Sequence, residues 1–330
     1  MSNLNWEYIQ NNPKIIKRLL GIEYEQLIQL MELGKKLNKE HQKKLEIEKR
    51  RLIKKGGGKP PKLSEENQII LTLIYLRHHL SFQLLGLTFG VSESTANDLF
   101  NYWLKILRYG LPASLLEQVK KSEQLINEVQ EKLTEYELIV DSEEQPIARA
   151  EDYQEQKKFS EGKKKNHTFK NQIITLPNGN EIVDVVTGKP GPTSDIKICR
   201  EVLYKFDNKQ QFIGDKAYVG ETQIKTPDKK PKKGELTELQ KQVNKELSSN
   251  RIFVEHLIRI IKIWRAAQER FRLNKSKYVD VFLTICGLVR LRIGALKLEI
   301  VKSADCQEVI YILLTHTFGS KMDFQENLTN

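Results

Sequence analysis

The feature that most constrains this chain is a short apolar run that ends on an acid. It reads Tyr136-Glu-Leu-Ile-Val-Asp141, and Pro146 follows closely. A run of this length that contains Ile and Val, followed by polar residues and a proline, predicts a strand that ends near the acid. We therefore expect Asp141 at the rim of a sheet.

Two further acids occur in related settings. The run Gln211-Phe-Ile-Gly-Asp215 predicts another short strand that ends on an acid, and Glu255 lies near the start of the helix-period segment 250–264. Two aspartates and a glutamate form an oxygen-only ligand set, which suits hard cations such as Mg²⁺ or Mn²⁺. Two such ions support in-line phosphoryl transfer, so we predict that Asp141, Asp215 and Glu255 bind metal.

Composition limits the cellular compartment and the kind of binding partner that we expect. The formal net charge of +11 over 330 residues favours a polyanionic partner, although a basic protein with no such partner fits the charge equally well. Cys199, Cys286 and Cys306 lie far apart and suggest neither a disulfide framework nor a thiolate metal site. No apolar run approaches the ~18 residues of a membrane span, and the first residues do not resemble a signal peptide. We expect a cytoplasmic protein that does not enter the membrane.

The N-terminal part predicts a helix over residues of about 12–55, with a strongly basic run over 35–62. Such a run is either a solvated helix face or a surface that contacts phosphates, and the sequence leaves both readings open. The segment Gly56–Pro61 breaks the helix and predicts a flexible linker. We therefore expect a basic helical region over 1–58.

The next region, 59–132, predicts a helical domain that contains a helix-turn-helix unit over 82–99. Gly86 is small where the two helices would cross, Gly90 permits the tight turn, and Ser92 can cap the second helix. The shared core of the unit would consist of Leu85, Phe89, Val91, Ala96 and Leu99. From Leu104 to Lys132 the pattern predicts a further amphipathic helix.

The second helix of this unit is a candidate DNA-binding element. Its candidate contacts are Ser92, Ser94, Thr95 and Asn97. Glu93 and Asp98 lie on the same exposed face, and their carboxylates would repel phosphates. A folding or dimerisation module is therefore an alternative to a DNA reader.

After Asp141 the sequence predicts a set of hairpins. The segment 147–149 predicts a return strand, and Asn178-Gly179 predicts a tight hairpin turn between strands over 168–176 and 181–187. A helix then leads to the strand before Asp215, and such a crossover can place that strand beside the strand before Asp141.

Other polar groups in this region have open roles. Glu144 is either an accessory metal ligand or a solvated neighbour. The basic loop that leads into the first hairpin strand suits a phosphate backbone through Lys163, Lys164, Lys165 and Lys170.

The segment around Glu255 predicts a helix with one buried side and one polar stripe. Its expected buried side consists of Ile252, Phe253, Leu257, Ile260, Ile261 and Trp264. The polar stripe consists of Arg251, Glu255, Arg259 and Lys262. This stripe is either a row of surface salt bridges or a metal ligand flanked by phosphate-binding cations. The polar segment 221–249 before it predicts a surface excursion that ends in a short helical piece.

The run from about 63 to 298 resembles the DDE-type transposases of the bacterial insertion-sequence-five group. The motifs that carry this resemblance are VDSEEQPIAR, FSEGKKKNHTFK, GDKAYVG and NRIFVEHLIRIIK. The resemblance implies an α+β chain in which an all-α helix-turn-helix domain precedes a ribonuclease H-like catalytic domain, a mixed sheet flanked by helices. That domain would span 133–300 with the basic excursion 221–249, and the tail 301–330 is not covered.

The resemblance also implies roles for particular residues. Asp141, Asp215 and Glu255 would hold two Mg²⁺ or Mn²⁺ ions in each active site. Arg251, Glu255 and Lys262 resemble an arginine–glutamate–lysine helix signature whose lysine holds DNA near the cleavage site.

The chain departs from the family pattern at several positions. Ser248 stands where relatives have a tyrosine, Ala217 stands where a glycine is common, and Ser194-Asp195 replaces a histidine–aspartate pair. None of these changes removes a predicted metal ligand.

The expected function is that of an insertion-sequence transposase. It would bind the terminal inverted repeats of its element and the target DNA, cleave strands and join them, as a homodimer or higher oligomer at the nucleoid. The alternatives are an inactive helix-turn-helix regulator of the same fold and a nuclease that cuts without strand transfer.

Overall fold

The computed structural model describes residues 4–48, 61–149, 152–159, 167–231, 234–298 and Thr317. The basic segments 49–60 and 160–166 and most of the tail from 299 onward lie outside this part. The predictions for Lys163, Lys164, Lys165 and the linker 56–61 fall largely on those segments.

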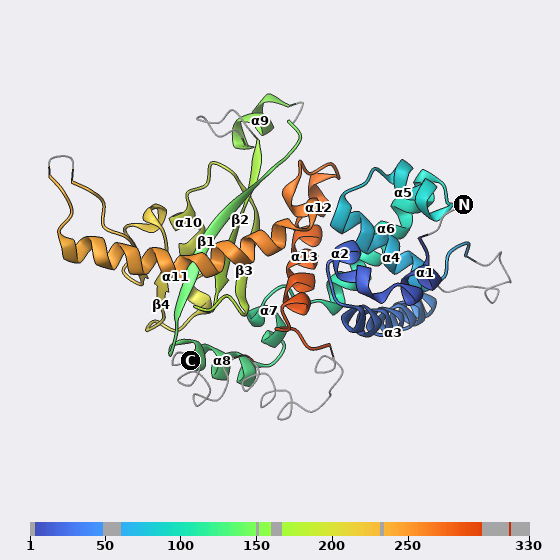
Figure 1. The fold of residues 1–330 in the computed structure, drawn as a ribbon, viewed down its shortest axis with the longest axis horizontal. Coiled ribbons are helices and arrows are strands. Elements are labelled where there is room, and N and C mark those ends of the chain that lie inside the picture. The colour runs from blue at the N-terminus through green and yellow to red at the C-terminus, as the bar shows by residue number, and fades with distance from the viewer. Residues whose placement is uncertain are drawn as a thin grey trace.

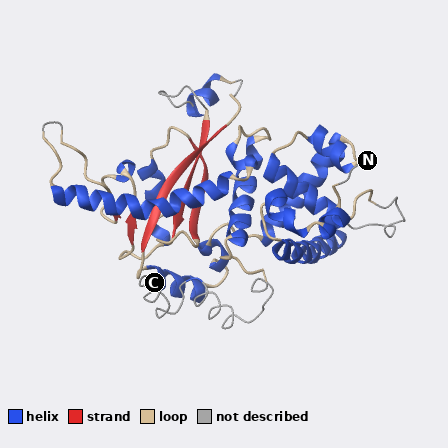
Figure 2. Ribbon diagram, in the orientation of Figure 1, coloured by secondary structure: helices blue, strands red, loops and turns tan. Residues whose placement is uncertain are grey.

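A mixed sheet forms the centre of the second half of the chain (Figure 2). In the described residues its strands are β1 (Glu137–Pro146), β2 (Thr168–Thr175), β3 (Ile182–Pro190), β4 (Gln211–Ile213) and β5 (Ile224–Lys225). Their order is β3-β2-β1-β4-β5. The β3–β2 and β2–β1 pairs are antiparallel, and the β1–β4 and β4–β5 pairs are parallel. This order and these directions define a ribonuclease H-like sheet, and the predicted fold class is confirmed.

Helices cover both faces of this sheet (Figure 1). The long helix α11 (Glu238–Lys262) crosses one face, where Ile139 and Ile173 join its apolar side in one core. The opposite face, with Leu138 and Val140, shares a second core with helices α7, α8 and α10. Their bounds are α7 (Leu115–Val119), α8 (Glu123–Leu133) and α10 (Asp195–Arg200). Helix α9 (Tyr153–Phe159) lies beyond the end of β1.

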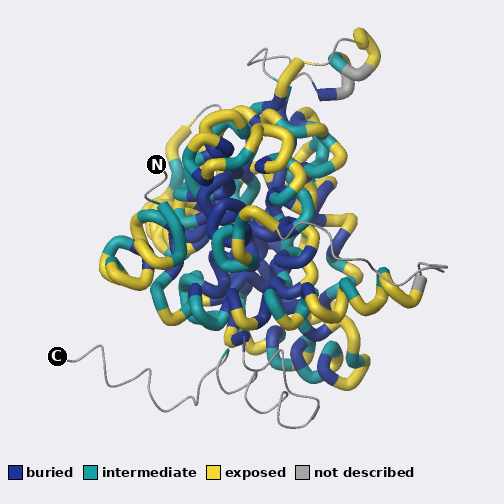
Figure 3. Tube along the Cα trace, turned by 90° about the vertical axis from the view of Figure 1, so that its right-hand side faces the viewer, coloured by how far each residue is buried: buried dark blue, intermediate teal, exposed yellow. Residues whose placement is uncertain are grey.

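The first half of the chain is helical, as predicted. Its helices are α1 (Trp6–Asn11), α2 (Ile16–Leu20), α3 (Tyr24–Glu48), α4 (Glu65–His78), α5 (Phe82–Phe89) and α6 (Glu93–Gly110). Helices α12 (Arg265–Gln268) and α13 (Tyr278–Arg292) lie between these helices and the sheet (Figure 1). One apolar core runs from Ile16 through Ile285 to Ile139, so it continues from one half to the other. Buried residues lie at the centre of the molecule, with exposed ones around them (Figure 3).

The predicted helices of the first half are broken at specific residues. The helix predicted over 12–55 is interrupted at Gly21, whose φ of 84° is left-handed, and a Cβ there would lie 2.7 Å from the Trp264 ring. The helix predicted over 104–132 is three helices, because Ser114 and Ser122 each cap a new one. The domain boundary predicted between residues 132 and 133 stays a prediction. Helices α7 and α8 precede this boundary in the chain, yet they share a core with the sheet that follows it.

Two strand predictions also need correction. Asp141 does not end its strand, because the antiparallel ladder with β2 continues from Asp141↔Ile173 to Pro146↔Thr168. The segment 147–149 is not a return strand, and only Ile147 forms an isolated bridge, to Phe271. The hairpin at Asn178-Gly179 is confirmed, with Gly179 at a φ of 67°.

The helix that carries Glu255 is longer than predicted. The short helical piece of the excursion is the first half of α11, which begins at a capping box of Thr237 and Gln240. This half projects beyond the sheet and is largely exposed (Figure 1). Within the described part of the chain, no helix is long and apolar enough to cross a membrane.

Candidate active site

One face of β1 carries a row of polar side chains toward α11 and α12. Side chains alternate along a strand, so Asp141, Glu143 and Gln145 share the face of Ile139. Arg251 contacts Asp141, Lys262 pairs with Glu143, and Gln145 donates to main-chain oxygens of α12 and its C-terminal end. The first two contacts fix the position of α11 along β1, and the third holds α12 against the same strand.

Asp141 and Asp215 emerge from neighbouring parallel strands. The β1–β4 pairing ends at Ile139↔Ile213, so each aspartate comes two residues after the last pair. Burial raises the pKa of Asp141, the charge of Asp215 raises it further, and Arg251 and the Ser142 N–H lower it. The predicted placement of the two strands side by side is confirmed by this register, and Asp215 lies near enough for its charge to raise the pKa of Asp141.

Glu255 is held apart from them by Arg251. The Arg251 Nη2 lies 3.3 Å from Asp141 Oδ2 and 3.8 Å from Glu255 Oε1, so one cation bridges the two acids. The Glu255 side chain is 55% exposed. Among the described residues, no three His, Cys, Asp or Glu side chains are grouped closely enough to hold a metal ion. The paired aspartate oxygens suit a hard cation, whereas the third predicted ligand is not assembled with them.

A second acid on the same face of β1 is Glu143, which is not among the predicted metal ligands. It is 5% exposed, accepts a hydrogen bond from Asn171 Nδ2 at 2.5 Å, and lies 3.4 Å from Lys262 Nζ. Burial raises the pKa of Glu143, and Lys262 and Asn171 oppose that shift. The signal in the sequence was its position two residues after Asp141, because alternate strand residues share a face.

Lys170 and Glu144 lie on the opposite face of the sheet. Lys170 is only 8% exposed, donates to the Thr193 carbonyl, and lies 3.5 Å from Glu144 and 3.2 Å from Asp195. These partners weigh against its predicted contact with a phosphate. Glu144 also accepts from Thr168 at 2.9 Å, so it does not accompany Asp141 as an accessory ligand.

The buried side of α11 differs in part from the prediction. Ile252 and Phe253 are 59% and 46% exposed. The side chains that it buries at its second half and C-terminal end are Val254, Leu257, Ile258, Ile261 and Trp264. The face is rotated because Arg251 and Lys262 must both reach β1. Arg259 is exposed and has no ion-pair partner among the described residues.

The helix-turn-helix unit is formed by α5 and α6 as predicted. Gly90 has a φ of 67°, and a Cβ on Gly86 would lie 2.7 Å from the Val91 carbonyl oxygen. Within the predicted core of the unit, Leu85, Phe89 and Ala96 are buried, and Val91 and Leu99 are half-buried.

The candidate DNA contacts lie at the start of α6. The Ser92 hydroxyl accepts from the Thr95 N–H at 3.1 Å and is also bonded to the hydroxyls of Ser94 and Thr95. Ser92 is therefore occupied as the helix cap, while Ser94 and Thr95 are exposed and Asn97 is half-buried.

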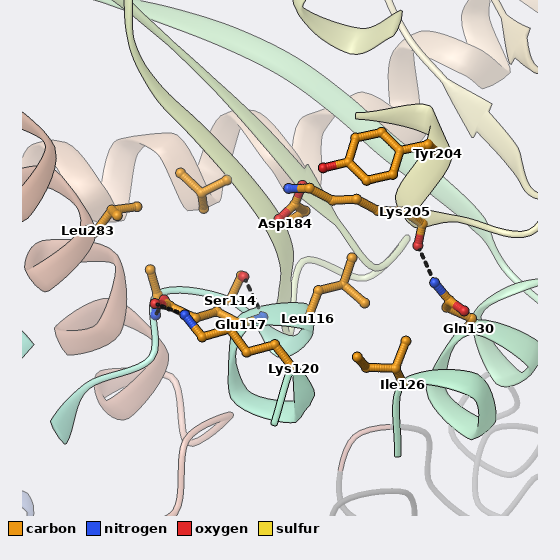
Figure 4. A pocket seen from close by; sticks show the side chains of 12 residues that line it. Ser114, Leu116, Glu117, Lys120, Ile126, Gln130, Asp184, Tyr204, Lys205 and Leu283 are labelled. Atoms are coloured by element: carbon orange, nitrogen blue, oxygen red, sulfur yellow. Dashed lines mark hydrogen bonds and ion pairs between the residues drawn. The ribbon is translucent and has the colours of Figure 1, made fainter. Parts of the chain in front are cut away.

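A hollow of about 450 Å³ lies elsewhere, between α7, α8 and the 3₁₀ turn at Leu203–Lys205 (Figure 4). Its polar wall includes the ion pair of Asp184 and Lys205, at 2.7 Å. Neither Asp141, Asp215 nor Glu255 lines it, so it is distinct from the carboxylate site.

These features define a class. The chain combines a helix-turn-helix unit with a ribonuclease H-like domain whose neighbouring strands bring two aspartates together. Family models agree with both parts. Residues 140–290 match the DDE superfamily endonuclease model, and residues 61–113 match the helix-turn-helix of DDE superfamily endonuclease.

A named relative extends the match over most of the chain. The chain is 34% identical over 233 residues to the probable transposase for insertion sequence element IS702 of Microchaete diplosiphon, covering 68% of this chain and 79% of the relative. The chain therefore belongs to the DDE-type insertion-sequence transposases, as the motifs predicted.

Solved structures of Mos1 transposase also align with the chain, but at a low level. A paired-end complex with the left transposon end shares 10% identity, covers 77% of this chain and 83% of that chain, and has a TM-score of 0.21. A Mos1 paired-end complex with Mg shares 12% identity over 82% of each chain, also at 0.21.

Proposed function

We propose that this chain binds the ends of its insertion sequence, cleaves DNA strands there with divalent metal, and joins them to target DNA. The observation that carries the proposal is the register of the parallel strands β1 and β4, which places Asp141 and Asp215 each two residues beyond the last shared pair, in a chain of this family. Glu255 lies on the helix that crosses the same face of the sheet.

Asp141, Asp215 and Glu255 are the residues that would hold Mg²⁺ or Mn²⁺, two ions in each site. Bound there, the metal supplies Lewis acidity for in-line phosphoryl transfer. The protein's own contribution is positional. The register of β1 and β4 sets the two aspartates. The Glu143–Lys262 contact positions α11, which carries Glu255, and Gln145 holds the helix that follows it, α12.

Arg251 acts in this proposal as the counter-ion of the acids before DNA and metal bind. It contacts Asp141 and Glu255 together, so Glu255 can approach Asp141 only when the guanidinium turns away. A DNA phosphate offers the freed guanidinium a new acceptor.

DNA would contact two parts of the chain. Ser94, Thr95 and Asn97 at the start of α6 are candidates for the element ends, with Ser92 in support as their cap. Arg259 on the exposed side of α11, Lys262, and Lys163, Lys164 and Lys165 are candidates near the scissile strand. The chain would act as a dimer or higher oligomer on DNA at the nucleoid. Lys170 is not among the proposed DNA contacts, because it is buried and already paired.

The test is a reaction on a supercoiled plasmid that carries the element ends. Purified protein is incubated with Mg²⁺, with Mn²⁺ or with EDTA, beside Asp141→Asn and a control, Asp228→Asn. Asp228 is an exposed acid whose main chain contacts Asn244 and whose carboxylate has no ion-pair partner among the described residues. We expect cleavage and joined products from wild type and from the control, in metal only. Cleavage without joined products would favour the nuclease, and binding without any cleavage would favour the regulator.

A further inference from the structure

Tyr218 is a buried tyrosine in the loop that carries Asp215. It lies in the 3₁₀ helix η3 (Lys216–Tyr218) and is 1% exposed. Its ring packs against the main chain of Gly214, where an added Cβ would lie 2.8 Å from the ring. The ring therefore contacts the residue that directly precedes Asp215.

The Tyr218 hydroxyl connects this loop to the centre of β1 and to β2. Gln172 Nε2 donates to the Tyr218 oxygen at 3.1 Å, which leaves the phenolic hydrogen for Ser142 Oγ at 2.9 Å. The Ser142 N–H in turn donates to Asp141 Oδ1 at 2.9 Å. A single hydroxyl thus joins the Asp215 loop to the residue that holds the Asp141 carboxylate.

The loop has its own short-range order around Asp215. The carboxylate accepts from the Ala217 N–H at 2.8 Å, and the Tyr218 N–H donates to the Asp215 carbonyl at 3.1 Å. Beyond Ile213 the loop leaves the β1–β4 ladder, so strand pairing no longer sets its position. Tyr218 provides a side-chain link to β1 at that point, and it does so from the sheet face opposite α11.

Burial supports this role. A tyrosine hydroxyl in an apolar core needs a partner, and here its surroundings include buried Leu138, Val140 and Cys199. Burial raises the pKa of Tyr218 far above its usual range, so the hydroxyl stays protonated and remains a hydrogen-bond donor.

We propose that Tyr218 is a positioning residue, which fixes the Asp215 loop against Ser142 and so sets the separation of the two aspartates. The inference rests on the proposed function, because it assigns that separation a role in holding metal. It adds Tyr218 and Ser142 to the residues on which the site depends, and neither is a proposed metal ligand or DNA contact.

The test compares Tyr218→Phe, Ser142→Ala and the double variant with wild type. Tyr75→Phe is the matched control, since Tyr75 is 2% exposed and lies on α4 in the helical half. Two quantities are measured: amide hydrogen exchange over 211–222 without metal, and Mn²⁺ binding by electron paramagnetic resonance. DNA affinity and the melting temperature are recorded for every variant.

We expect faster exchange at Ala217 and Tyr218 in both single variants, and Mn²⁺ binding weakened about tenfold, the lower end of the usual effect of losing a supporting hydrogen bond around a metal site. The double variant should bind Mn²⁺ no more weakly than the more affected single variant, because both changes remove the same Tyr218–Ser142 hydrogen bond. Tyr75→Phe should change neither quantity, and DNA affinity should stay unchanged throughout.

Unchanged exchange and unchanged Mn²⁺ binding in Tyr218→Phe would overturn the inference, and so would effects that add in the double variant. The exchange measurement needs no metal. A wild-type chain that binds no Mn²⁺ would therefore contradict the proposed function, while the exchange data would still decide whether Tyr218 fixes the loop.

Discussion

Arg290 is a buried arginine whose loss should weaken the contact between α13, the start of α7 and the residue before β3. It is 0% exposed and donates to both carboxylate oxygens of Glu181, at 2.6 and 2.7 Å. It also donates to the carbonyls of Pro112 and Ser114 and to the Gln118 side chain. One guanidinium on α13 therefore joins the start of α7 to the hairpin before β3.

Replacing Arg290 with Met would leave the Glu181 carboxylate, 2% exposed, buried without a counter-charge. Breaking one partner of a buried ion pair costs about 3–5 kcal/mol, a large fraction of the roughly 5–15 kcal/mol that stabilises a folded protein. For a chain of this size, each kcal/mol lowers the melting temperature by about 2–3 °C. We therefore expect a fall of roughly 6–15 °C.

The assays are thermal unfolding and urea unfolding, both followed by circular dichroism, with Arg290→Met/Glu181→Leu as a second variant. The double variant should recover part of the loss, because neither charge is then buried alone. Arg265→Met is the control. Its guanidinium is 58% exposed and lies 3.3 Å from Glu269, so its loss should cost less than about 1 kcal/mol. A loss below 1 kcal/mol in Arg290→Met, or no recovery in the double variant, would refute the reasoning.

Three further outcomes are expected. Because burial raises the pKa of Asp141, its ionised form costs the native state free energy, and stability falls as pH rises from the unfolded pKa through the folded one. Asp141→Asn should therefore raise the melting temperature in EDTA at neutral pH, with the gain vanishing in acid, and a lower melting temperature at neutral pH would contradict this. Lys262→Met leaves Glu143 buried and unpaired, so urea unfolding should show a loss of about 1–3 kcal/mol, larger than in Glu143→Gln, and equal losses would count against the pair. Gly86→Ala forces a Cβ to within 2.7 Å of the Val91 oxygen, so it should cost about 1–3 kcal/mol and weaken binding to the element ends, measured by fluorescence anisotropy; unchanged stability and binding would argue against the tight crossing.

Local sequence signals located much of this architecture. Some features depend only on a few neighbouring residues, so the sequence alone was enough to predict them. They are the Asn178-Gly179 turn, the Gly86 and Gly90 pair, and the acid after β4. The approach of Asp141 and Asp215 followed from one topological rule, that a crossover can return a strand beside an earlier one.

The features that were not predicted from the sequence depend on how segments far apart in the chain align with one another. The place where β1 ends depends on its pairing with β2, and the apolar run before Asp141 does not contain that information. The rotation of α11 depends on Arg251 and Lys262 both reaching β1. Periodicity alone therefore predicted, wrongly, that Ile252 is buried. Tyr218 became a candidate only when its hydroxyl was found beside Ser142, on another strand.

The most direct test of metal binding by the aspartates is a change of ligand at Asp141. Wild type, Asp141→Cys and Asp141→Ala are compared for cleavage at the element ends in Mg²⁺, in Mn²⁺ and in EDTA. Mg²⁺ prefers oxygen ligands, whereas Mn²⁺ tolerates a thiolate better. The account predicts that Asp141→Cys is inactive in Mg²⁺ and partly active in Mn²⁺, while Asp141→Ala is inactive in both. Full activity of Asp141→Cys in Mg²⁺, or cleavage by wild type in EDTA, would contradict it.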